Sequence, residues 1–380
     1  MNRIPFEYGS IAENEYFIDR EEDRKTLKSF LGNGINVMLV SPRRWGKSSL
    51  VKTAMKELQA ERKDIRVCFL DAYKIYTEED FYNKFASAVL QGASSSIEKR
   101  WAELVRFVQG IAPSVTVSSD PMNAVEVKLS FQPLKESAEE ILNLPEKIAR
   151  EKGLEIVVCI DEFQQLANLT CWKRLEGMMR SVWQHQQHTT YCLYGSKRHM
   201  MMDIFGNSRN PFYRFGQLLT MGKIAKEYWA PFIHDSFHNH GKSISDAMID
   251  RICRTVQCHT WYMQQFCFLI WTQTETEVTE EIFTSQLSKL LDTNGTMFLS
   301  DIDGMPSSQI AFLRAVCMGE THFNAQQVVA AYGLGSPGTI TKNKKLLVEK
   351  DYIEKQGAAY RMVDPVFELW FKREYCGGKI

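Results

Sequence analysis

The sequence of 380 residues lacks several features that would assign it to large classes of protein. It contains no run of about 18 consecutive apolar residues, so we expect no membrane-spanning helix and no membrane partner. Residues 1–17 contain no apolar core of a signal peptide, and the nine cysteines form no C-x-x-C pair. Scattered thiols of this kind are typical of a protein of the reducing cytoplasm, which is where we expect this chain to act.

The sequence also lacks a net charge and the common hydrolase and zinc motifs. Its 46 basic residues balance 46 acidic ones, so no overall electrostatic field favours nucleic acid or a membrane surface. There is no G-x-S-x-G motif, and the pair His234 and His238 has neither the glutamate of H-E-x-x-H nor an evident third ligand. The remaining composition, 44% hydrophobic and 24% charged, is typical of a globular protein. At this length we expect more than one domain.

The first half of the sequence alternates short apolar runs with helical patterns, which predicts a parallel sheet covered by helices. The apolar runs are nearly continuous, as strands buried on both faces require. One segment, about residues 113–131, instead alternates apolar and polar residues around Ser-Asp-Pro and predicts an inserted β-hairpin. The expected strands are Ile35–Val40, Ile65–Asp71, Glu155–Ile160 and Thr190–Tyr194, and the expected helices are Lys47–Gln59, Glu78–Leu90, Trp172–Gln187 and Arg198–Phe205.

The second half of the sequence changes character twice. From about Tyr228 the strand patterns stop, and Ser245–Thr274 and Glu280–Leu291 are predicted to be helical. A winged helix-turn-helix is then predicted, because three short helices precede a two-stranded hairpin. We therefore expect a core over residues 1–225, a helical lid over 226–300 and a winged-helix domain over 301–380. The elements of that last domain are Ser307–Met318, Asn324–Tyr332, Thr339–Glu349, Tyr352–Lys355 and Ala359–Val363.

One loop carries the residue types that hold a phosphate chain. The strand ending at Val40 is followed by a glycine, a lysine, a hydroxyl side chain and a helix, which is the P-loop arrangement. Backbone N–H groups of such a loop surround the phosphates, Lys47 neutralises their charge and Ser48 ligates Mg²⁺. Ser41 stands where the motif has its first glycine, which we interpret as a tolerated exchange of small residues. The predicted nucleotide-binding residues here are Ser41, Pro42, Arg43, Arg44, Trp45, Gly46, Lys47, Ser48 and Ser49.

A second apolar strand supplies the acidic half of the same site. It runs from Ile156 to Ile160 and ends in Asp161 and Glu162. The carboxyl ends of parallel strands meet at one edge of a sheet, so these carboxylates are expected beside the P-loop. Asp161 is predicted to hold Mg²⁺ together with Ser48, and Glu162 to orient the attacking water as a base. The two motifs together predict an α/β P-loop NTPase core with a parallel sheet, a helical lid and a C-terminal winged helix, and they predict ATP and Mg²⁺ as ligands.

These motifs, in their order and spacing, resemble those of the bacterial and archaeal P-loop ATPase family related to AAA+ and STAND proteins, whose architecture is similar to that of replication-origin initiators. Ser41–Leu50 is similar to the family's G-P-R-R-x-G-K-[ST]-[ST]-L loop except at the first position. Ile160–Gln164 resembles its acidic strand end, commonly D-E-F/I-Q. Tyr16–Asp23 resembles F-x-G-R-E-x-E, which implies that Arg20 lies near the adenine, although Asp19 replaces the glycine.

The resemblance extends over nearly the whole chain and implies further site residues. Tyr194–Met201 resembles a G-S-x-x-x-x-M stretch, which implies that Ser196 is a polar sensor. Asn210–Gly216 resembles a stretch that makes Arg214 a candidate γ-phosphate or subunit-interface arginine, so a homo-oligomer is a candidate assembly. Two further segments resemble motifs of the family. Cys258–Gln264 is similar to G-x-P-x-Y-x-Q but lacks the Gly and the Pro. Asp364–Phe371 matches the D-P-x-x-x-x-W motif near the end of the family's chains.

Two functions are compatible with these motifs. The first is an MgATP hydrolase in which the nucleotide state moves the lid and the winged helix relative to the core. Its predicted catalytic residues are Lys47, Asp161, Glu162, Ser196 and Arg214. The second is a nucleotide-gated module with little turnover that binds DNA or a protein through Thr339–Lys350. The side chains that favour DNA on that predicted helix are Thr339, Thr341, Lys342, Asn343, Lys344 and Lys345.

Overall fold

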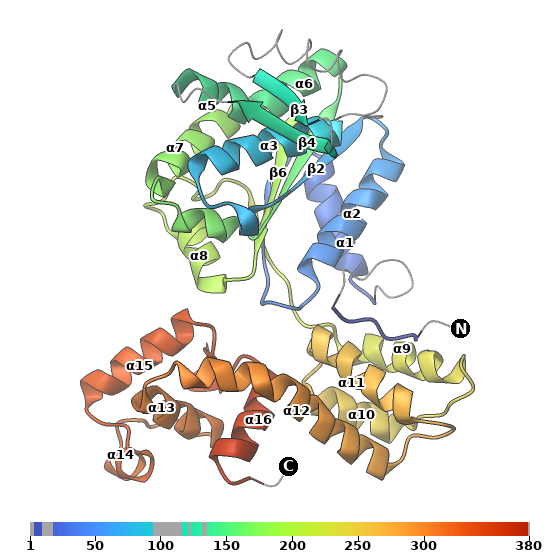
Figure 1. The fold of residues 1–380 in the computed structure, drawn as a ribbon, viewed down its shortest axis with the longest axis vertical. Helices are drawn as coiled ribbons and strands as arrows, with labels where there is room; N and C mark the ends of the chain where they lie inside the picture. The colour runs from blue at the N-terminus through green and yellow to red at the C-terminus, as the bar shows by residue number, and fades with distance from the viewer. Residues whose placement is uncertain (1–3, 10–17, 94–115, 121–122, 131–134, 379–380) are drawn as a thin grey trace. The chain divides into compact units, whose positions relative to one another are not determined.

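A computed structural model describes residues 4–9, 18–93, 116–120, 123–130 and 135–378 of the chain (Figure 1). The chain divides into two compact units, one formed by Arg20–Gly222 and the other by Met1–Asp19 together with Lys223–Ile380. Each unit has its own hydrophobic core. None of the helices within the described ranges is both long enough and apolar enough to cross a membrane.

The unit Arg20–Gly222 is built on a five-stranded parallel sheet with the order β2-β5-β6-β1-β7. The three central strands, β5, β6 and β1, are almost fully buried, which agrees with their nearly continuous apolar sequences. The strand β7 was not predicted from the sequence, because it is short and its side chains are half-exposed at the sheet edge. The strands are β1 (Val37–Val40), β2 (Ile65–Asp71), β5 (Glu155–Asp161), β6 (Thr189–Gly195) and β7 (Gln217–Thr220).

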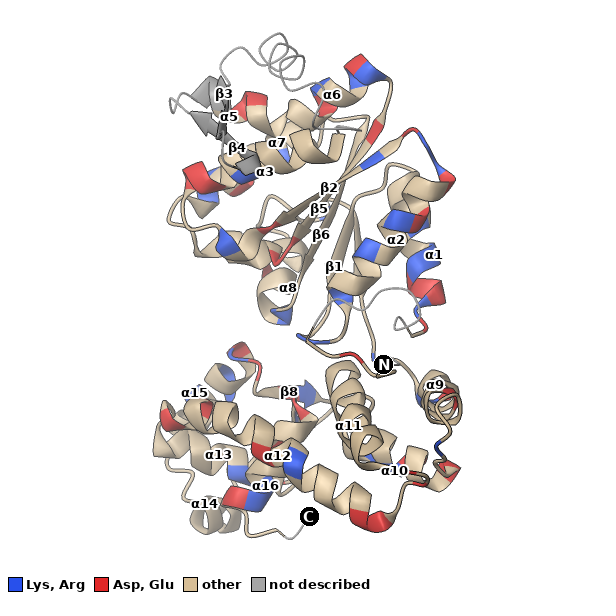
Figure 2. Cartoon of the chain, turned by 45° about the vertical axis from the view of Figure 1, so that its right-hand side comes forward, with Lys and Arg blue, Asp and Glu red and all other residues tan. Residues whose placement is uncertain are grey.

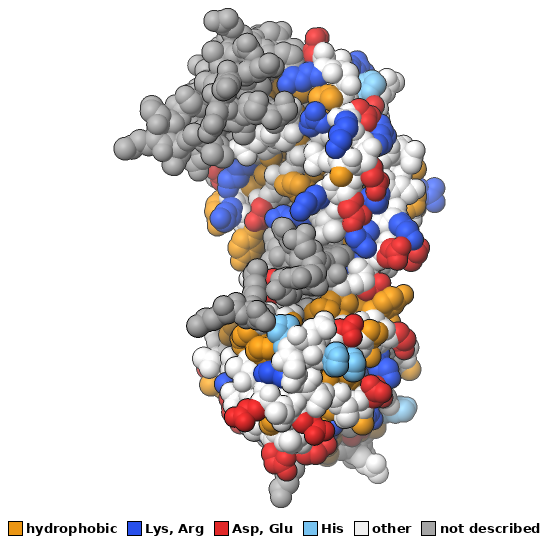
Figure 3. Space-filling model, turned by 90° about the vertical axis from the view of Figure 1, so that its right-hand side faces the viewer, with side chains coloured by type: hydrophobic (Ala, Val, Ile, Leu, Met, Phe, Trp, Pro, Cys, Tyr) orange, Lys and Arg blue, Asp and Glu red, His pale blue; other side chains and the backbone are white. Residues whose placement is uncertain are grey.

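Helices cover both faces of this sheet (Figure 2). One face packs against α1 (Glu21–Gly32) and α2 (Lys47–Glu61). Their outer surface in Figure 3 mixes basic and acidic side chains, and ion pairs such as Lys28 with Glu57 join the two helices. The other face is covered by α3 (Glu78–Ala93), α5 (Lys135–Leu142), α6 (Leu144–Lys152), α7 (Trp172–Trp183) and α8 (Arg198–Gly206). The predicted α/β sheet covered by helices is therefore confirmed.

The expected β-hairpin is present as a separate two-stranded sheet. Strands β3 (Thr116–Asp120) and β4 (Asn123–Ser130) pair antiparallel. Residues 113–115, 121–122 and 131 of the predicted segment lie outside the described residues. In Figure 1 the hairpin lies over α3, and α3 contacts β4. It is therefore an addition to the α/β layers and supplies no strand to the central sheet.

The second unit contains three helices before α12 (Glu280–Asp303), whereas the sequence predicted helical structure there only over Ser245–Thr274. The predicted helical stretch Ser245–Thr274 is interrupted, because Gln257 and Cys258 both have left-handed backbones, with φ of 49° and 52°, that a helix cannot contain. Two helices result, α10 (Asp246–Thr255) and α11 (Thr260–Gln273). Before them lies α9 (Lys226–His238), which was not predicted and contains Pro231. The following helix, α12 (Glu280–Asp303), is longer than expected and continues past residue 300.

A winged helix follows, with the order of elements that the sequence predicted. One more helix at the end was not predicted, although Asp364 caps its first turn by accepting hydrogen bonds from the backbone N–H groups of Val366 and Phe367. The elements are α13 (Ser307–Cys317), α14 (Gln326–Tyr332), α15 (Pro337–Glu349), β8 (Ile353–Gln356), β9 (Ala359–Met362) and α16 (Pro365–Tyr375).

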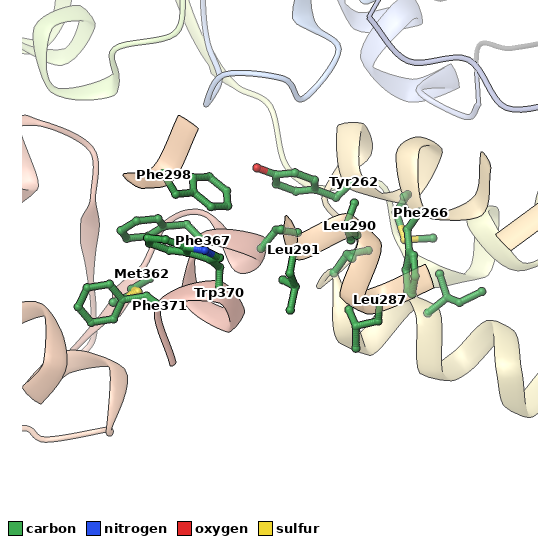
Figure 4. Packing of buried hydrophobic residues seen from close by; sticks show 14 of the residues in the cluster. Tyr262, Phe266, Leu287, Leu290, Leu291, Phe298, Met362, Phe367, Trp370 and Phe371 are labelled. Atoms are coloured by element: carbon green, nitrogen blue, oxygen red, sulfur yellow. The ribbon is translucent and has the colours of Figure 1, made fainter. Parts of the chain in front are cut away.

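The helical lid and the winged helix share one hydrophobic core (Figure 4). Leu291 and Phe298 of α12 continue the row of buried side chains from Phe266 of the lid to Trp370 of α16. Gly295 lies at the tightest point, because a Cβ there would come within 2.8 Å of the Trp370 Nε1 atom. The two predicted domains are therefore joined by packing as well as by α12.

Candidate nucleotide site

The P-loop connects the end of β1 to the start of α2. Gly46 immediately precedes α2 with a φ of 89°, a conformation that glycine adopts at little cost. Arg44 is also left-handed, with a φ of 64°. Ser41 is fully buried and is not among the residues with positive φ, so the first position of this loop does not need glycine. Its backbone N–H donates to the carbonyl of Gly195, at 3.3 Å, which fixes the start of the loop to β6.

Lys47, in the first turn of α2, is directed at the acidic end of β5. Its side chain is 10% exposed, and its Nζ lies 2.5 Å from Glu162 Oε1 and 3.5 Å from Asp161 Oδ1. The strand order places β1 and β5 on either side of β6, so these residues approach each other across the carboxyl edge of the sheet. A buried ammonium group in this position has strong electrostatic attraction for any anion that enters the site.

Ser48 and Asp161 form a second contact across the same edge. The Ser48 hydroxyl donates to Asp161 Oδ2 at 2.6 Å. Hydroxyl and carboxylate oxygens are ligands that suit Mg²⁺, which is commonly held by one or two protein groups together with substrate phosphates. No group of three or more His, Cys, Asp or Glu residues suited to a metal occurs within the described ranges. The Ser48 hydroxyl and the Asp161 carboxylate together fit a magnesium ion that also binds phosphate oxygens.

Glu162 is held at both carboxylate oxygens. Oε1 accepts from Lys47, while Oε2 accepts from the Ser196 hydroxyl at 2.7 Å and from Gln164 Nε2 at 2.5 Å. Burial by itself would raise the pKa of Glu162, but the Lys47 charge and these hydrogen bonds outweigh it and keep the pKa below its ordinary value. Its left-handed backbone, with a φ of 49°, turns the chain out of β5 into the 3-10 helix η3 (Phe163–Asn168). The carboxylate is therefore both ionised and fixed in orientation.

Asp161 differs from its neighbour in its electrostatics. Burial raises the pKa of Asp161, and this effect exceeds the opposing influence of Lys47 and of the Ser48 hydroxyl. The charge of Glu162 beside it acts in the same direction as burial. An additional positive charge at this position would stabilise the ionised form of Asp161, as a divalent cation does.

Arg20 reaches the P-loop from the start of α1. Its side chain is only 6% exposed and donates from Nη2 to the Trp45 carbonyl at 3.4 Å and from Nη1 to the Gly222 carbonyl at 2.8 Å. It also pairs with Asp23. Arg20 thus contacts the P-loop, and its place near the adenine stays a prediction, while Tyr16 and Phe17 of the same motif lie outside the described residues.

The remaining residues singled out from the sequence are more dispersed. Ser49 is buried in α2, Pro42 and Trp45 are half-buried, and Arg43 and Arg44 are exposed on the loop. Arg214 is also exposed, has a left-handed φ of 54°, and places its guanidinium 5.2 Å from the Tyr213 ring. Within the described ranges no hydrogen bond or ion pair joins Arg214 to Lys47, Asp161 or Glu162.

Two residues contribute to the site that were given no role from the sequence. Gln164 appeared only as the last letter of the D-E-F-Q match, yet it is fully buried against Glu162. Gly195 ends β6, and a Cβ there would lie 1.8 Å from Gln164 Oε1. Gln164 lies only two residues after Glu162, so the sequence could have indicated that it is near this carboxylate. Its contact with Gly195 joins segments about thirty residues apart, and only the fold reveals that contact.

The helix α15 presents the other candidate binding surface. Asn343 is buried and donates from Nδ2 to the Ser308 carbonyl of α13 at 3.0 Å, so it holds the domain together and is not on the outer face. Lys344 lies over the rings of Phe323 and Tyr360, and Lys345 pairs with Glu349 at 3.7 Å. Lys342 is exposed. The structure thus leaves fewer outward-facing side chains on α15 than the sequence suggested.

Comparison with known families gives two matches along the chain. Residues 17–247 match the family described as "ATPase domain predominantly from Archaea", and residues 296–373 match the family described as "probable winged helix domain". A search of curated proteins finds no match. The first match covers the sheet, the P-loop and the acidic strand end, and the second covers the domain with α13–α16.

Solved structures include several with the same overall fold. The Walker-type ATPase PABY2304 of Pyrococcus abyssi superposes with a TM-score of 0.70 at 18% identity, covering 97% of this chain and 99% of that one. The ORC2 protein of Aeropyrum pernix, solved in ADPNP–ADP complexes, superposes with a TM-score of 0.57 at 10% identity, covering 98% of each chain. At these identities the likeness concerns the fold, which is an α/β P-loop core followed by helices and a winged helix.

Proposed function

Because the chain belongs to the family of ATPase domains found predominantly in Archaea, we propose that it binds MgATP at the P-loop of residues 41–48 and hydrolyses it. The observation that carries this proposal is the meeting of Lys47, Ser48, Asp161 and Glu162 at the carboxyl edge of the sheet. These side chains come from two strand ends more than a hundred residues apart, and together they supply a cation, a hydroxyl and two carboxylates. That set is the one needed for metal-assisted phosphoryl transfer to water.

In this proposal Lys47 binds the β- and γ-phosphates, while Ser48 and Asp161 hold the magnesium ion. The ion would supply charge neutralisation for the phosphates as the bond to the leaving oxygen weakens. Gly46 and the N-terminal turn of α2 present backbone N–H groups to the same phosphates. The exposed Arg43 and Arg44 add positive charge at the rim of the loop.

Glu162 is the proposed base that orients the attacking water. In the structure its Oε1 is paired with Lys47. A triphosphate competes for that lysine, because its charge is larger than that of one carboxylate, so Lys47 would exchange Glu162 for phosphate when the nucleotide binds. The exchange frees Oε1 to accept a proton from water while Oε2 remains held by Ser196 and Gln164. Ser196 is therefore a positioning residue for the base.

We further propose that the nucleotide state acts on the lid and the winged helix as a single body. Their shared core supports this, as does the hydrogen bond from the Tyr262 hydroxyl of α11 to Asp364 Oδ2 at 2.6 Å. Asp364 also caps α16, so the same carboxylate serves both parts. Hydrogen exchange with and without MgATP is expected to change together in α10–α12 and α13–α16. A change confined to α10–α12 would contradict motion as one body.

The test of hydrolysis is steady-state phosphate release by the full chain. Glu162→Gln is expected to lower kcat by about a hundredfold or more, while MgATP still raises the melting temperature, because binding to the native state stabilises it. Lys47→Ala is expected to abolish that stabilisation. Lys56→Ala, on the exposed side of the same helix, is the matched control and should behave as wild type.

Two results would contradict the proposal. Equal rates of phosphate release for wild type and Glu162→Gln would remove the proposed base. Unchanged stabilisation of Lys47→Ala by MgATP would place the nucleotide elsewhere, because no other described lysine reaches the Asp161–Glu162 pair.

A further inference from the structure

Gln164 contacts both the Glu162 carboxylate and Gly195. It lies two residues after Glu162, at the second residue of η3, and it is 0% exposed. Its Nε2 donates to Glu162 Oε2 at 2.5 Å. The Ser196 hydroxyl donates to the same oxygen at 2.7 Å, so Oε2 is held by two neutral donors and Oε1 by Lys47.

The oxygen of the same Gln164 amide group is closely confined by Gly195. This Oε1 atom lies against Gly195, so close that a Cβ atom at residue 195 would be 1.8 Å from this oxygen. Within the described ranges this oxygen has no hydrogen-bond partner although it is buried. Rotating the amide by half a turn would direct Oε1 at the Glu162 carboxylate, where two acceptors would repel each other. The amide therefore has one favourable orientation, with its N–H group toward Glu162.

A buried acceptor without a partner costs free energy, commonly about 1–3 kcal/mol. An apolar side chain would fill the same space without that cost. Buried unsatisfied groups of this kind are uncommon in native proteins and are often found where function requires them. The position of Gln164 is thus explained by what its Nε2 does to Glu162 and not by packing alone.

We propose that Gln164 is a positioning residue that fixes the Glu162 carboxylate for attack by water on ATP. The proposal rests on the function proposed above. Lys47 restrains Oε1 only until phosphate takes the lysine, whereas Gln164 and Ser196 restrain Oε2 throughout. Gly195 takes part indirectly, because only a residue without a side chain leaves space for the Gln164 amide.

The test compares Gln164→Met with Gln165→Met in steady-state phosphate release. Methionine has nearly the length of glutamine but cannot donate a hydrogen bond. We expect kcat of Gln164→Met to fall roughly 10- to 100-fold, with KM for ATP within about twofold of wild type, because a misplaced group affects the transition state more than binding. Gln165 is half-buried and binds Asn168, so Gln165→Met should keep wild-type kcat.

A double-mutant cycle separates positioning from a general loss of structure. Gly195→Ala displaces the Gln164 amide and should lower kcat about as much as Gln164→Ala does. The double variant Gly195→Ala/Gln164→Ala should be no slower than Gln164→Ala, since the smaller side chain gives the new methyl group its space. If Gln164→Met melts well below wild type, Gln164→Glu keeps the size and should also lose kcat, because it places a second acid beside Glu162.

The outcomes distinguish this inference from the proposed function. If the wild type hydrolyses ATP and Gln164→Met has the same kcat as wild type, the positioning role is overturned while the proposed hydrolysis stands. Loss of MgATP stabilisation in parallel with kcat would also overturn it, since the residue would then act through binding. Wild-type turnover equal to that of Lys47→Ala would overturn the proposed hydrolysis and the positioning role with it.

Discussion

The P-loop edge of the sheet and the helix α15 of the winged helix contain similar residues, yet the fold uses them in opposite ways. Each includes the first turns of a helix, α2 or α15, and each supplies lysine and hydroxyl side chains. At the P-loop edge Lys47, Ser48, Asp161 and Glu162 converge within hydrogen-bond distance, mostly buried. On α15 the corresponding side chains are separated and engaged with their own domain.

The difference shows that residue type alone does not define a binding site. At the sheet edge, parallel strands bring distant segments together at one place, and burial strengthens the interaction of each charge with its partners. A single helix on a surface spreads its side chains around its axis, and each one finds a local partner or water. Convergence supports a chemical function at the first surface, and nothing comparable supports one on α15.

The largest expected effect is at Asp161, the proposed metal ligand. Asp161→Asn keeps the shape of the side chain but removes its charge, so we expect kcat for phosphate release to fall by about 10²- to 10³-fold. The magnesium concentration needed for half-maximal rate should rise as well. The matched control is Asp71→Asn on β2, because Asp71 is the register partner of Asp161 but is exposed. A comparable loss of rate in Asp71→Asn would show that the convergence at Asp161 is not special.

The second prediction concerns the stability of the winged helix. Asn343→Ala removes the hydrogen bond to Ser308 and leaves a cavity, so the free energy of unfolding should fall by about 1–3 kcal/mol. Lys342→Ala, one residue earlier and exposed, should change it by less than about 0.5 kcal/mol. Denaturant titration of both variants measures the difference. Equal effects would mean that Asn343 is not the structural residue that its burial indicates.

A third prediction contrasts a partnered buried carboxylate with one that has no partner. Glu176 of α7 is 0% exposed, and neither of its oxygens has a hydrogen-bond partner among the described residues, whereas Glu162 is bonded at both. Burial raises the pKa of Glu176 above its ordinary value of 4.5. The folded state therefore binds the proton more tightly than the unfolded state, and the stability that this group supplies below its ordinary pKa is lost as pH rises.

Glu176→Met should consequently stabilise the protein by about 1–2 kcal/mol at pH 8, with a smaller gain as pH falls toward the ordinary value. Thermal melts over a pH series measure this effect, and phosphate release should be unchanged. Glu79→Met, at an exposed position of α3, is the control and should show no such pH dependence. A gain that grew as pH fell would reverse the expected sign and contradict the assignment.

The smallest expected effect is on the surface of α15. Lys345 is 77% exposed and pairs with Glu349 at 3.7 Å, so Lys345→Ala should change the free energy of unfolding by less than about 0.5 kcal/mol. Lys344→Ala should cost slightly more, because Lys344 also lies over the Phe323 and Tyr360 rings. A salt series of duplex DNA binding with Lys342→Ala completes the comparison, since a basic interface must weaken as salt rises.

Much of the fold followed from the sequence because its strands are apolar and its motifs are local. The strands β2 and β5 match the expected ranges closely, and the P-loop lies between a strand and a helix as its residues require. The strand β7 and the helix α9 were missed, since short half-exposed strands and helices with an internal proline have weak patterns. The helices α1, α5, α6 and α16 were not predicted either. The break at Gln257 and Cys258 was also missed, because neither residue is a usual helix terminator.

For the site, the sequence by itself was enough to propose which residues bind phosphate and magnesium, because Gly46, Lys47, Ser48 and the acidic pair are contiguous within their two motifs. The tertiary structure decided how those motifs meet, which oxygen of Glu162 each neighbour holds, and that Gln164 and Gly195 belong to the site. It also decided that Asn343 points inward and that Arg214 is exposed. The reason is physical: a motif specifies chemistry along the chain, whereas burial and orientation depend on segments far apart that only packing brings into contact.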